Sequence, residues 1–291
     1  MSQSIKVINS CDDEKVVLRL GVLTERSIGF KQWLLHHLRS RNCSRVLDVA
    51  CGTGGDSLFL LKHGFQVVSS DSADAMLRQA RHARKSYESQ QQHGTWDIEK
   101  ANWLTLRADL GDYGEFDAVL CMGNSLLCLT DPTPNFGLYR RCLENFKSML
   151  KPGGVLLLDH RNIDVIMDRG DPINKNVYFK EDNIKRISSA IVHSHGQADV
   201  VNFTFDMRVN SHTDEDGDKI TNDLDITPGN NNEVEIEKVS VPLQAIRAQQ
   251  LSTLLAEVFG ENCERALYGD FKSAFTMSDT AYFQHVITKK K

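Results

Sequence analysis

The amino-acid sequence predicts an α/β protein built on a seven-stranded, doubly wound sheet with an antiparallel β-rich insertion. Short apolar runs alternate with amphipathic helical segments over roughly the first 160 residues, which is typical of a parallel sheet with right-handed crossovers. The first apolar run enters a glycine-rich turn, as a buried parallel strand often does. After about residue 170 the pattern changes to two-residue alternation, which predicts antiparallel strands.

Length and composition limit what the chain can be. Its 291 residues suffice for one large α/β domain with an insertion, or for two small domains. Hydrophobic residues make up 41%, which allows a sizeable core and excludes a globally disordered chain. The formal net charge of -5 argues against a general nucleic-acid binder, which would usually be basic.

The cysteines and the apolar runs bear on the compartment. The seven cysteines are an odd number without a Cys-x-x-Cys pair, and no Cys/His spacing predicts a zinc site, so we expect reduced thiols and no metal. The first residues lack a secretory signal, and no apolar run approaches the ~20 residues that cross a bilayer. We therefore expect a soluble cytoplasmic protein with neither a membrane nor a nucleic acid as partner.

The predicted elements divide the chain into four segments. These are a leader (1–28), the core (29–169), a β-rich insertion that forms a lid (170–242) and a completion of the core sheet (243–291). Core strands are expected at 45–50, 66–70, 104–107, 116–121 and 155–159, and helices at 30–38, 56–63, 73–86 and 139–150. Outside the core we expect a short helix at 16–20, strands at 187–195, 199–209, 265–268 and 282–288, and a helix at 243–259. For the acidic, Asn-rich loop at 212–233 a solvated linker is the default.

The turn after the first predicted strand is the candidate ligand site. In doubly wound sheets a ligand lies beyond the carboxyl ends of the strands, where the strand order reverses. The turn at residues 48–54 contains Gly52 and Gly54, which permit positive φ and a close approach of the backbone to a ligand. A dinucleotide-binding turn would carry a third glycine where Ser57 stands, so an NAD-dependent dehydrogenase is the weaker alternative.

Asp71 ends the second predicted strand and is the candidate ribose ligand. A carboxylate at this position can accept hydrogen bonds from both ribose hydroxyls of an adenosine ligand. The alternative is structural, with Asp71 or Ser72 capping the helix that follows. The neighbouring glycine turn favours ribose binding.

Six short motifs resemble the glycine N-methyltransferase family in order and spacing. They are residues 45–54 (RVLDVACGTG), 99–103 (EKANW), 116–119 (FDAV), 123–125 (GNS), 159–162 (DHRN) and 269–272 (GDFK), within a similarity that covers about residues 26–288. The resemblance implies the Rossmann-like fold of class I methyltransferases that depend on S-adenosyl-L-methionine. It also implies methylation of the amine of glycine to sarcosine, a place in one-carbon metabolism, a homotetramer and a folate inhibitor.

The resemblance further implies which residues hold the two ligands. Arg26 would bind the carboxylate of the cofactor's methionine part, Asp71 the ribose, and Asn102 with Trp103 the adenine. The other implied cofactor-binding positions are Ala50, Gly52, Ser72, Met76, Met122 and Ser125. The acceptor would be held by Asn124 at its amine, by Arg161 at its carboxylate, and by Tyr178.

Chemical reasoning supports the acceptor site independently. Arg161 follows the fifth predicted strand, where a planar guanidinium can clamp a small carboxylate, although an ordinary ion pair is the alternative. Trp103 could instead belong to the core, and we expect His160 to be structural. No residue is required as a general acid or base, because a neighbouring sulfonium and a partly desolvated pocket would lower the pKa of the acceptor amine.

The sequence departs from the family pattern around the acceptor. Family aromatic positions fall on Val16 and Arg19, one of two paired tyrosines is Phe179, and another aligns near Phe205. A Tyr-Tyr pair expected near residues 239–241 is missing. Two alternatives therefore stay open: a methyltransferase for sarcosine or another small amino acid, and a weakly active S-adenosylmethionine-binding sensor.

Overall fold

The computed structural model describes residues 26–89, 95–133, 135–179, 184–193, 199–209, 212–213, 219–220, 235–260 and 263–290. The helix predicted at 16–20 and nearly all of the leader lie outside these ranges, as does most of the acidic loop. Of that loop only the two short paired strands β8 (His212–Thr213) and β9 (Lys219–Ile220) are described.

A mixed sheet of seven strands forms the centre of the molecule, in the order β11-β12-β5-β4-β1-β2-β3, and confirms the predicted fold. Its parallel part consists of β1 (Arg45–Asp48), β2 (Gln66–Asp71), β3 (Trp96–Lys100), β4 (Phe116–Cys121) and β5 (Leu150–Arg161). Two antiparallel strands, β12 (Tyr282–Lys289) and β11 (Cys263–Gly269), extend it beyond β5. Because the strand order reverses between β1 and β4, the crevice at their carboxyl ends is the expected place for a ligand.

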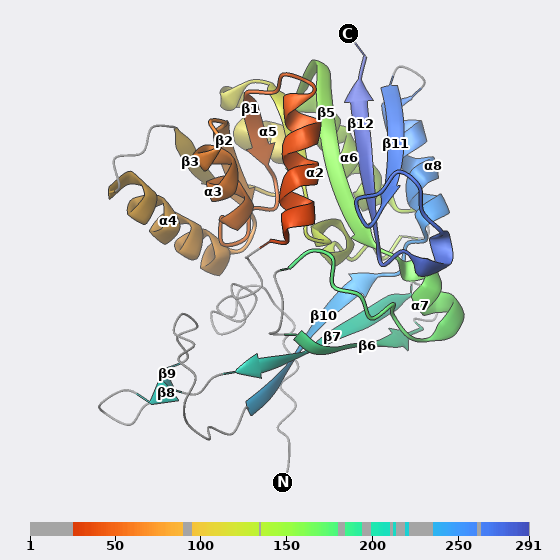
Figure 1. Cartoon of the computed structure of the whole chain (residues 1–291). Helices are drawn as coiled ribbons and strands as arrows, with labels where there is room; N and C mark the ends of the chain where they lie inside the picture. The colour runs from red at the N-terminus through yellow and green to blue at the C-terminus, as the bar shows by residue number, and fades with distance from the viewer. Residues whose placement is uncertain are drawn as a thin grey trace.

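Helices cover both faces of this sheet (Figure 1). Helices α2 (Ile28–Arg39), α3 (Gly55–Lys62) and α4 (Asp74–Ser89) pack on one face, and α5 (Leu106–Leu110), α6 (Gly137–Ser148) and α8 (Ala248–Phe259) on the other. Side chains that are adjacent in a strand, such as Val46 and Leu47, belong to opposite layers of the core. Burial on both faces explains why these strands are continuous apolar runs in the sequence.

A second sheet lies across the carboxyl ends of the parallel strands (Figure 1). It has the order β10-β7-β6 and consists of β6 (Ile184–Val192), β7 (Val200–Val209) and β10 (Glu235–Gln244), all antiparallel. The short helix α7 (Ile163–Arg169) connects β5 toward it. Val201, Phe203 and Leu243 are buried in the core beneath this sheet. The four segment boundaries given above remain predictions.

Two local predictions were wrong, and one helix was missed. The strand expected at 104–107 is the start of helix α5, and the third strand is β3 at Trp96–Lys100. As an edge strand, β3 buries only Trp96 and Ile98 and therefore lacks an apolar run, whereas Leu106 and Leu110 are spaced as one face of a helical turn. The helix expected from residue 243 begins at Ala248, because pairing with β7 keeps Leu243 and Gln244 in β10, and residues 245–247 connect the two elements. Helix α7 was not predicted.

Candidate functional site

A cavity of about 470 Å³ opens between the carboxyl ends of the parallel strands and the second sheet. Residues that follow β1, β2 and β4 form one wall, as the strand order requires. The opposite wall consists of apolar side chains of the second sheet and its flanks, namely Phe179, Phe203, Phe205, Val241 and Leu243. One side of the cavity is thus polar and made of turns, and the other is apolar and made of strands.

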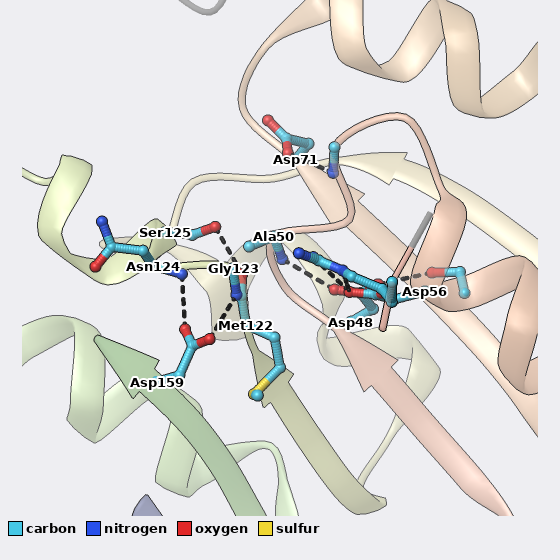
Figure 2. A network of polar contacts seen from close by, with 12 residues as sticks. Asp48, Ala50, Asp56, Asp71, Met122, Gly123, Asn124, Ser125 and Asp159 are labelled. Carbon is cyan, nitrogen blue, oxygen red and sulfur yellow. Dashed lines mark hydrogen bonds and ion pairs between the residues drawn. The ribbon is translucent and has the colours of Figure 1, made fainter. Parts of the chain in front are cut away.

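The glycine turn after β1 curves around the end of β2. Gly52 has φ +52°, and its N–H donates to Asp71 at 2.9 Å, which links the two strand ends (Figure 2). Gly54 has φ +87°, and a Cβ there would lie 2.8 Å from the ring of Trp96. Gly52 therefore lines the cavity, whereas Gly54 is needed for close packing of the turn against β3.

Asp71 contacts the backbone at the start of α4 and also lines the cavity. One carboxylate oxygen accepts from the N–H of Ala73 at 3.0 Å, which supports the start of α4, and the other accepts from Gly52. The half-buried side chain also lines the cavity. The contact of Asp71 with the start of α4 is therefore compatible with its position in the cavity wall.

Asp48 supports the glycine turn from beneath. It is buried and accepts from the hydroxyl of Ser57 at 2.7 Å and from the N–H of Ala50 at 3.3 Å. Burial, with a smaller contribution from the charge of Asp56, raises the pKa of Asp48 to about 7. Asp48 is absent from the cavity lining and holds the turn in place.

Arg26 and Asp56 form an ion pair in the cavity wall. Nε of Arg26 donates to the carboxylate at 2.9 Å and Nη2 donates at 2.7 Å, a bidentate arrangement. The guanidinium carbon lies 5.1 Å from the ring centre of Phe30 and 5.2 Å from that of Phe179. Burial opposes the charge of Arg26, but the facing carboxylate of Asp56 raises its pKa above the ordinary value, so Arg26 remains cationic.

Asn102 and Trp103 lie beyond β3, next to the glycine turn. The indole N–H of Trp103 donates to the carbonyl of Val49 at 2.6 Å, and its ring meets Phe146 edge-on at 5.8 Å. The side-chain oxygen of Asn102 accepts from the N–H of Leu104 at 2.9 Å, which shapes the loop. Trp103 thus both packs against the core and presents a surface to the cavity.

The turn after β4 is held by a buried carboxylate. Asp159 accepts from the backbone N–H of Gly123 at 3.0 Å and of Asn124 at 2.7 Å, and Figure 2 shows both N–H groups directed at it. Burial raises the pKa of Asp159 to about 6, while a hydrogen bond from the hydroxyl of Tyr178 opposes that rise. Asn124 adopts φ +66°, and its side-chain oxygen accepts from the backbone N–H of Arg161 at 2.7 Å.

Arg161 lies directly behind the cavity wall. The residue is 1% exposed, and its guanidinium carbon lies 4.8 Å from the ring centre of Phe203 and 4.5 Å from that of Tyr282, both of which line the cavity. Nη2 donates to the carbonyl of Ile173 at 2.6 Å, whereas Nη1 is buried without a hydrogen-bond partner. Within the described ranges no ion pair of Arg161 is found.

The structure brings most of the predicted site residues together. Eleven lie on the cavity wall: Arg26, Ala50, Gly52, Asp71, Ser72, Met76, Asn102, Trp103, Met122, Asn124 and Ser125. Arg161 and Tyr178 are not on the wall but one layer behind it, since the hydroxyl of Tyr178 contacts Asp159 and Gln284. His160 is buried, with Nε2 3.0 Å from Nε2 of His285, which fits the expected structural role.

Sequence reasoning missed several wall residues. Asp56 directly follows the glycine turn on the first turn of α3, so its position beside the ligand site could have been inferred. The apolar residues of β7 and β10 gave no such signal, because only the pairing of the two strands sets Phe203 opposite Val241. Tyr282 reaches the wall from the start of β12, far along the chain.

Comparisons with known proteins identify the family. Residues 46–154 match the model of a methyltransferase domain. The glycine N-methyltransferase of Mus musculus is 36% identical over 278 residues, which cover 94% of this chain and 88% of that protein. The chain belongs to the glycine N-methyltransferase family. The resemblance seen in the six motifs is thereby confirmed.

A more distant relative and a solved structure are also similar to this chain. A glycine/sarcosine N-methyltransferase of Halorhodospira halochloris is 28% identical over 259 residues, covering 89% of this chain and 80% of that protein. An S-adenosylmethionine-dependent methyltransferase structure from Clostridium acetobutylicum has a TM-score of 0.61 at 12% identity, covering 90% of this chain and 92% of that one. At this identity the structural match confirms the fold alone.

The described part of the molecule was also searched for membrane-spanning helices and for metal-binding groups. No helix there is long and apolar enough to cross a membrane. No group of three or more His, Cys, Asp or Glu side chains in those same ranges is placed to hold a metal ion.

Proposed function

We propose that this protein transfers the methyl group of S-adenosyl-L-methionine to the amine of glycine, giving sarcosine and S-adenosylhomocysteine. Family membership supports the reaction, and one observation supports the acceptor: the buried Nη1 of Arg161, which has no hydrogen-bond partner in the described structure. An unpaired buried donor costs free energy, so it points to a ligand that completes the site. A small carboxylate is the ligand whose charge and geometry fit a guanidinium.

The polar wall has the groups that the cofactor requires. Asp71 lies at the end of β2, where a carboxylate can accept from ribose hydroxyls, and Gly52 offers open backbone beside it. Arg26 is a cation for the carboxylate of the methionine part, and Asn102 with Trp103 would flank the adenine. Ala50, Ser72, Met76, Met122 and Ser125 would complete the cofactor subsite. The residues present therefore fit S-adenosyl-L-methionine.

Asn124 and Arg161 would together orient the acceptor. The side-chain oxygen of Asn124 already accepts from the backbone N–H of Arg161, which turns the amide toward the strand that carries the guanidinium. Its second lone pair can accept from an amine N–H and leave the nitrogen lone pair free. Tyr178 would act from behind, through its hydrogen bond to Asp159, which holds the turn that carries Asn124.

The protein's contribution to the reaction is placement and desolvation. When bound, the cofactor supplies an electrophilic methyl group on a sulfonium sulfur. Alignment of the amine with that methyl group can contribute about 7–11 kcal/mol in favourable cases. The apolar wall of Phe203, Phe205 and Val241 excludes water, which lowers the pKa of the acceptor ammonium and releases the neutral amine without a dedicated base.

A methyl-transfer assay with labelled cofactor tests the proposal. We expect turnover with glycine, and sarcosine and dimethylglycine as parallel acceptors report how far the apolar wall tolerates N-methyl groups. Tight cofactor binding without transfer to any of the three would refute the proposed reaction and favour a sensor.

We also propose the finer properties that the family resemblance implies, namely a cytoplasmic homotetramer that acts in one-carbon metabolism and is inhibited by a folate. Light scattering on the purified protein tests the tetramer. Adding a reduced folate to the same methyl-transfer assay tests the inhibition.

A further inference from the structure

The ion pair of Arg26 and Asp56 faces the cavity and does not lie behind it. Both side chains line the cavity and retain some exposure, 15% for Arg26 and 12% for Asp56. The described hydrogen bonds of Arg26 to Asp56 use Nε and Nη2, and none of them uses Nη1. The carboxylate likewise has lone pairs beyond those that Arg26 occupies.

Packing holds the pair in a fixed place. The guanidinium contacts the rings of Phe30 and Phe179, and a Cβ on Gly123 would lie 3.0 Å from Nη2. Asp56 is fixed by its position in the first turn of α3, directly after the glycine turn. Asp71 lies at the end of β2, whereas Asp56 lies in the first turn of α3, and both are labelled in Figure 2. The two carboxylates therefore reach the cavity from different elements.

The formal charges of the wall match those of the cofactor. Arg26, Asp56 and Asp71 are the charged side chains among the described residues that line the cavity, and together they carry one net negative charge. S-adenosyl-L-methionine has a sulfonium, an ammonium and a carboxylate, and so carries one net positive charge. If Asp71 accepts from neutral ribose hydroxyls, Asp56 is the remaining carboxylate for the ammonium.

We propose that Arg26 and Asp56 form a dipolar dock for the amino-acid end of the cofactor, in which Asp56 accepts from the α-ammonium and Nη1 of Arg26 donates to the α-carboxylate. The inference rests on the proposed function and assigns a binding role to Asp56. The dock explains why an acidic residue stands beside the arginine, since a carboxylate receptor alone would be weakened by it. It also selects against adenosine ligands with an anionic phosphate chain, which Asp56 repels.

Calorimetric titration with two ligands tests the assignment. The first is S-adenosylhomocysteine, and the second is its analogue with hydrogen in place of the amino group. In the unchanged protein, loss of the amino group should weaken binding about 10- to 100-fold, as expected for a hydrogen bond between charged groups. In Asp56→Asn, S-adenosylhomocysteine should bind about 10- to 100-fold more weakly, and the analogue within about threefold of its original affinity or more tightly.

The outcomes separate the alternatives. Equal weakening of both ligands by Asp56→Asn would mean that Asp56 only positions Arg26, and an unchanged affinity for S-adenosylhomocysteine would mean that it has no role; either overturns the dock. Asp74→Asn is the matched control, because Asp74 is an exposed aspartate paired with Lys100 and is absent from the cavity wall. If Asp56→Asn does not fold, Asp56→Glu with the same two ligands replaces it. Failure of the unchanged protein to bind S-adenosylhomocysteine would refute the proposed function instead.

Discussion

The two arginines of the site differ in how their charge is balanced. Arg26, in the polar wall, is held by a bidentate pair with Asp56 and stacks on aromatic rings. Arg161, behind the apolar wall, has no acidic partner in the described structure and retains a buried Nη1 without a hydrogen bond. A paired guanidinium is stable with or without a ligand, whereas an unpaired buried one is satisfied only when a ligand arrives. The polar end is therefore preformed, and the acceptor end is completed by its substrate.

The largest effect that tests this comparison is expected from Arg161→Met. Removing a buried charge that pairs with a substrate carboxylate costs about 2–5 kcal/mol, so kcat/KM for glycine should fall by about 30- to several-thousand-fold. The affinity for S-adenosylhomocysteine should stay nearly unchanged, as measured by calorimetry. Arg247→Met, which removes a surface pair with Asp164 and Asp168, is the control. Equal losses of turnover and cofactor affinity would contradict the division between the two ends.

A second prediction tests how rigidly the polar end is preformed. In Gly54→Ala the new Cβ would lie 2.8 Å from Trp96 in a backbone with φ +87°, so we expect a loss of about 2–5 kcal/mol of unfolding free energy in urea. Gly64→Ala has nearly the same φ, +88°, with nothing within 4 Å of the new Cβ, and should lose only about 1–2 kcal/mol. Similar losses in both variants would show that the turn has room to move.

A third prediction concerns Asp71. Asp71→Asn should weaken S-adenosylhomocysteine binding by about 10- to 100-fold, because a charged acceptor for the ribose hydroxyls is lost. The kcat at saturating cofactor should change less, since the ribose hydroxyls take no part in the transfer of the methyl group. Asp97→Asn on the exposed side of β3 serves as the control. Unaltered binding in Asp71→Asn would leave only the helix-capping role.

The smallest effect concerns the buried histidine pair of His160 and His285. Burial lowers the pKa of His160 to about 4 and holds the pKa of His285 well below its usual value. As the pH falls, these two histidines take up protons in the unfolded chain before they do so in the folded protein. Their contribution therefore lowers the free energy of unfolding as the pH falls below about 6.5. His285→Gln should remove about 1 kcal/mol of this loss between pH 7.5 and 5.5, measured by urea unfolding at both values. The raised pKa values of Asp48 and Asp159 act in the opposite direction but are common to both proteins, so they cancel.

The polar end could be predicted from the sequence because its parts are short and local. The glycine turn and Asp71 at the end of a strand are each predicted from a few neighbouring residues, and the parallel sheet brings such strand ends together. Asn124 was implied by the short motif that resembles the family. The predictions for β3 and β10 failed because these strands depend on contacts between distant parts of the chain. β3 is half-exposed at the edge of the sheet, and β10 is a strand because ten of its residues pair with β7.

The sequence by itself determined the fold, the family and the strand-end turns that carry Gly52 and Asp71, since strand and turn chemistry are local properties. Only the tertiary structure decided that Asp56 stands beside Arg26, that Phe203 and Tyr282 enclose the guanidinium of Arg161, and that one of its nitrogens is left without a partner. These relations join residues that are 30 to more than 100 positions apart, such as Arg26 with Asp56 and Arg161 with Tyr282. Their pairing depends on how the two sheets pack, and short-range patterns do not encode it.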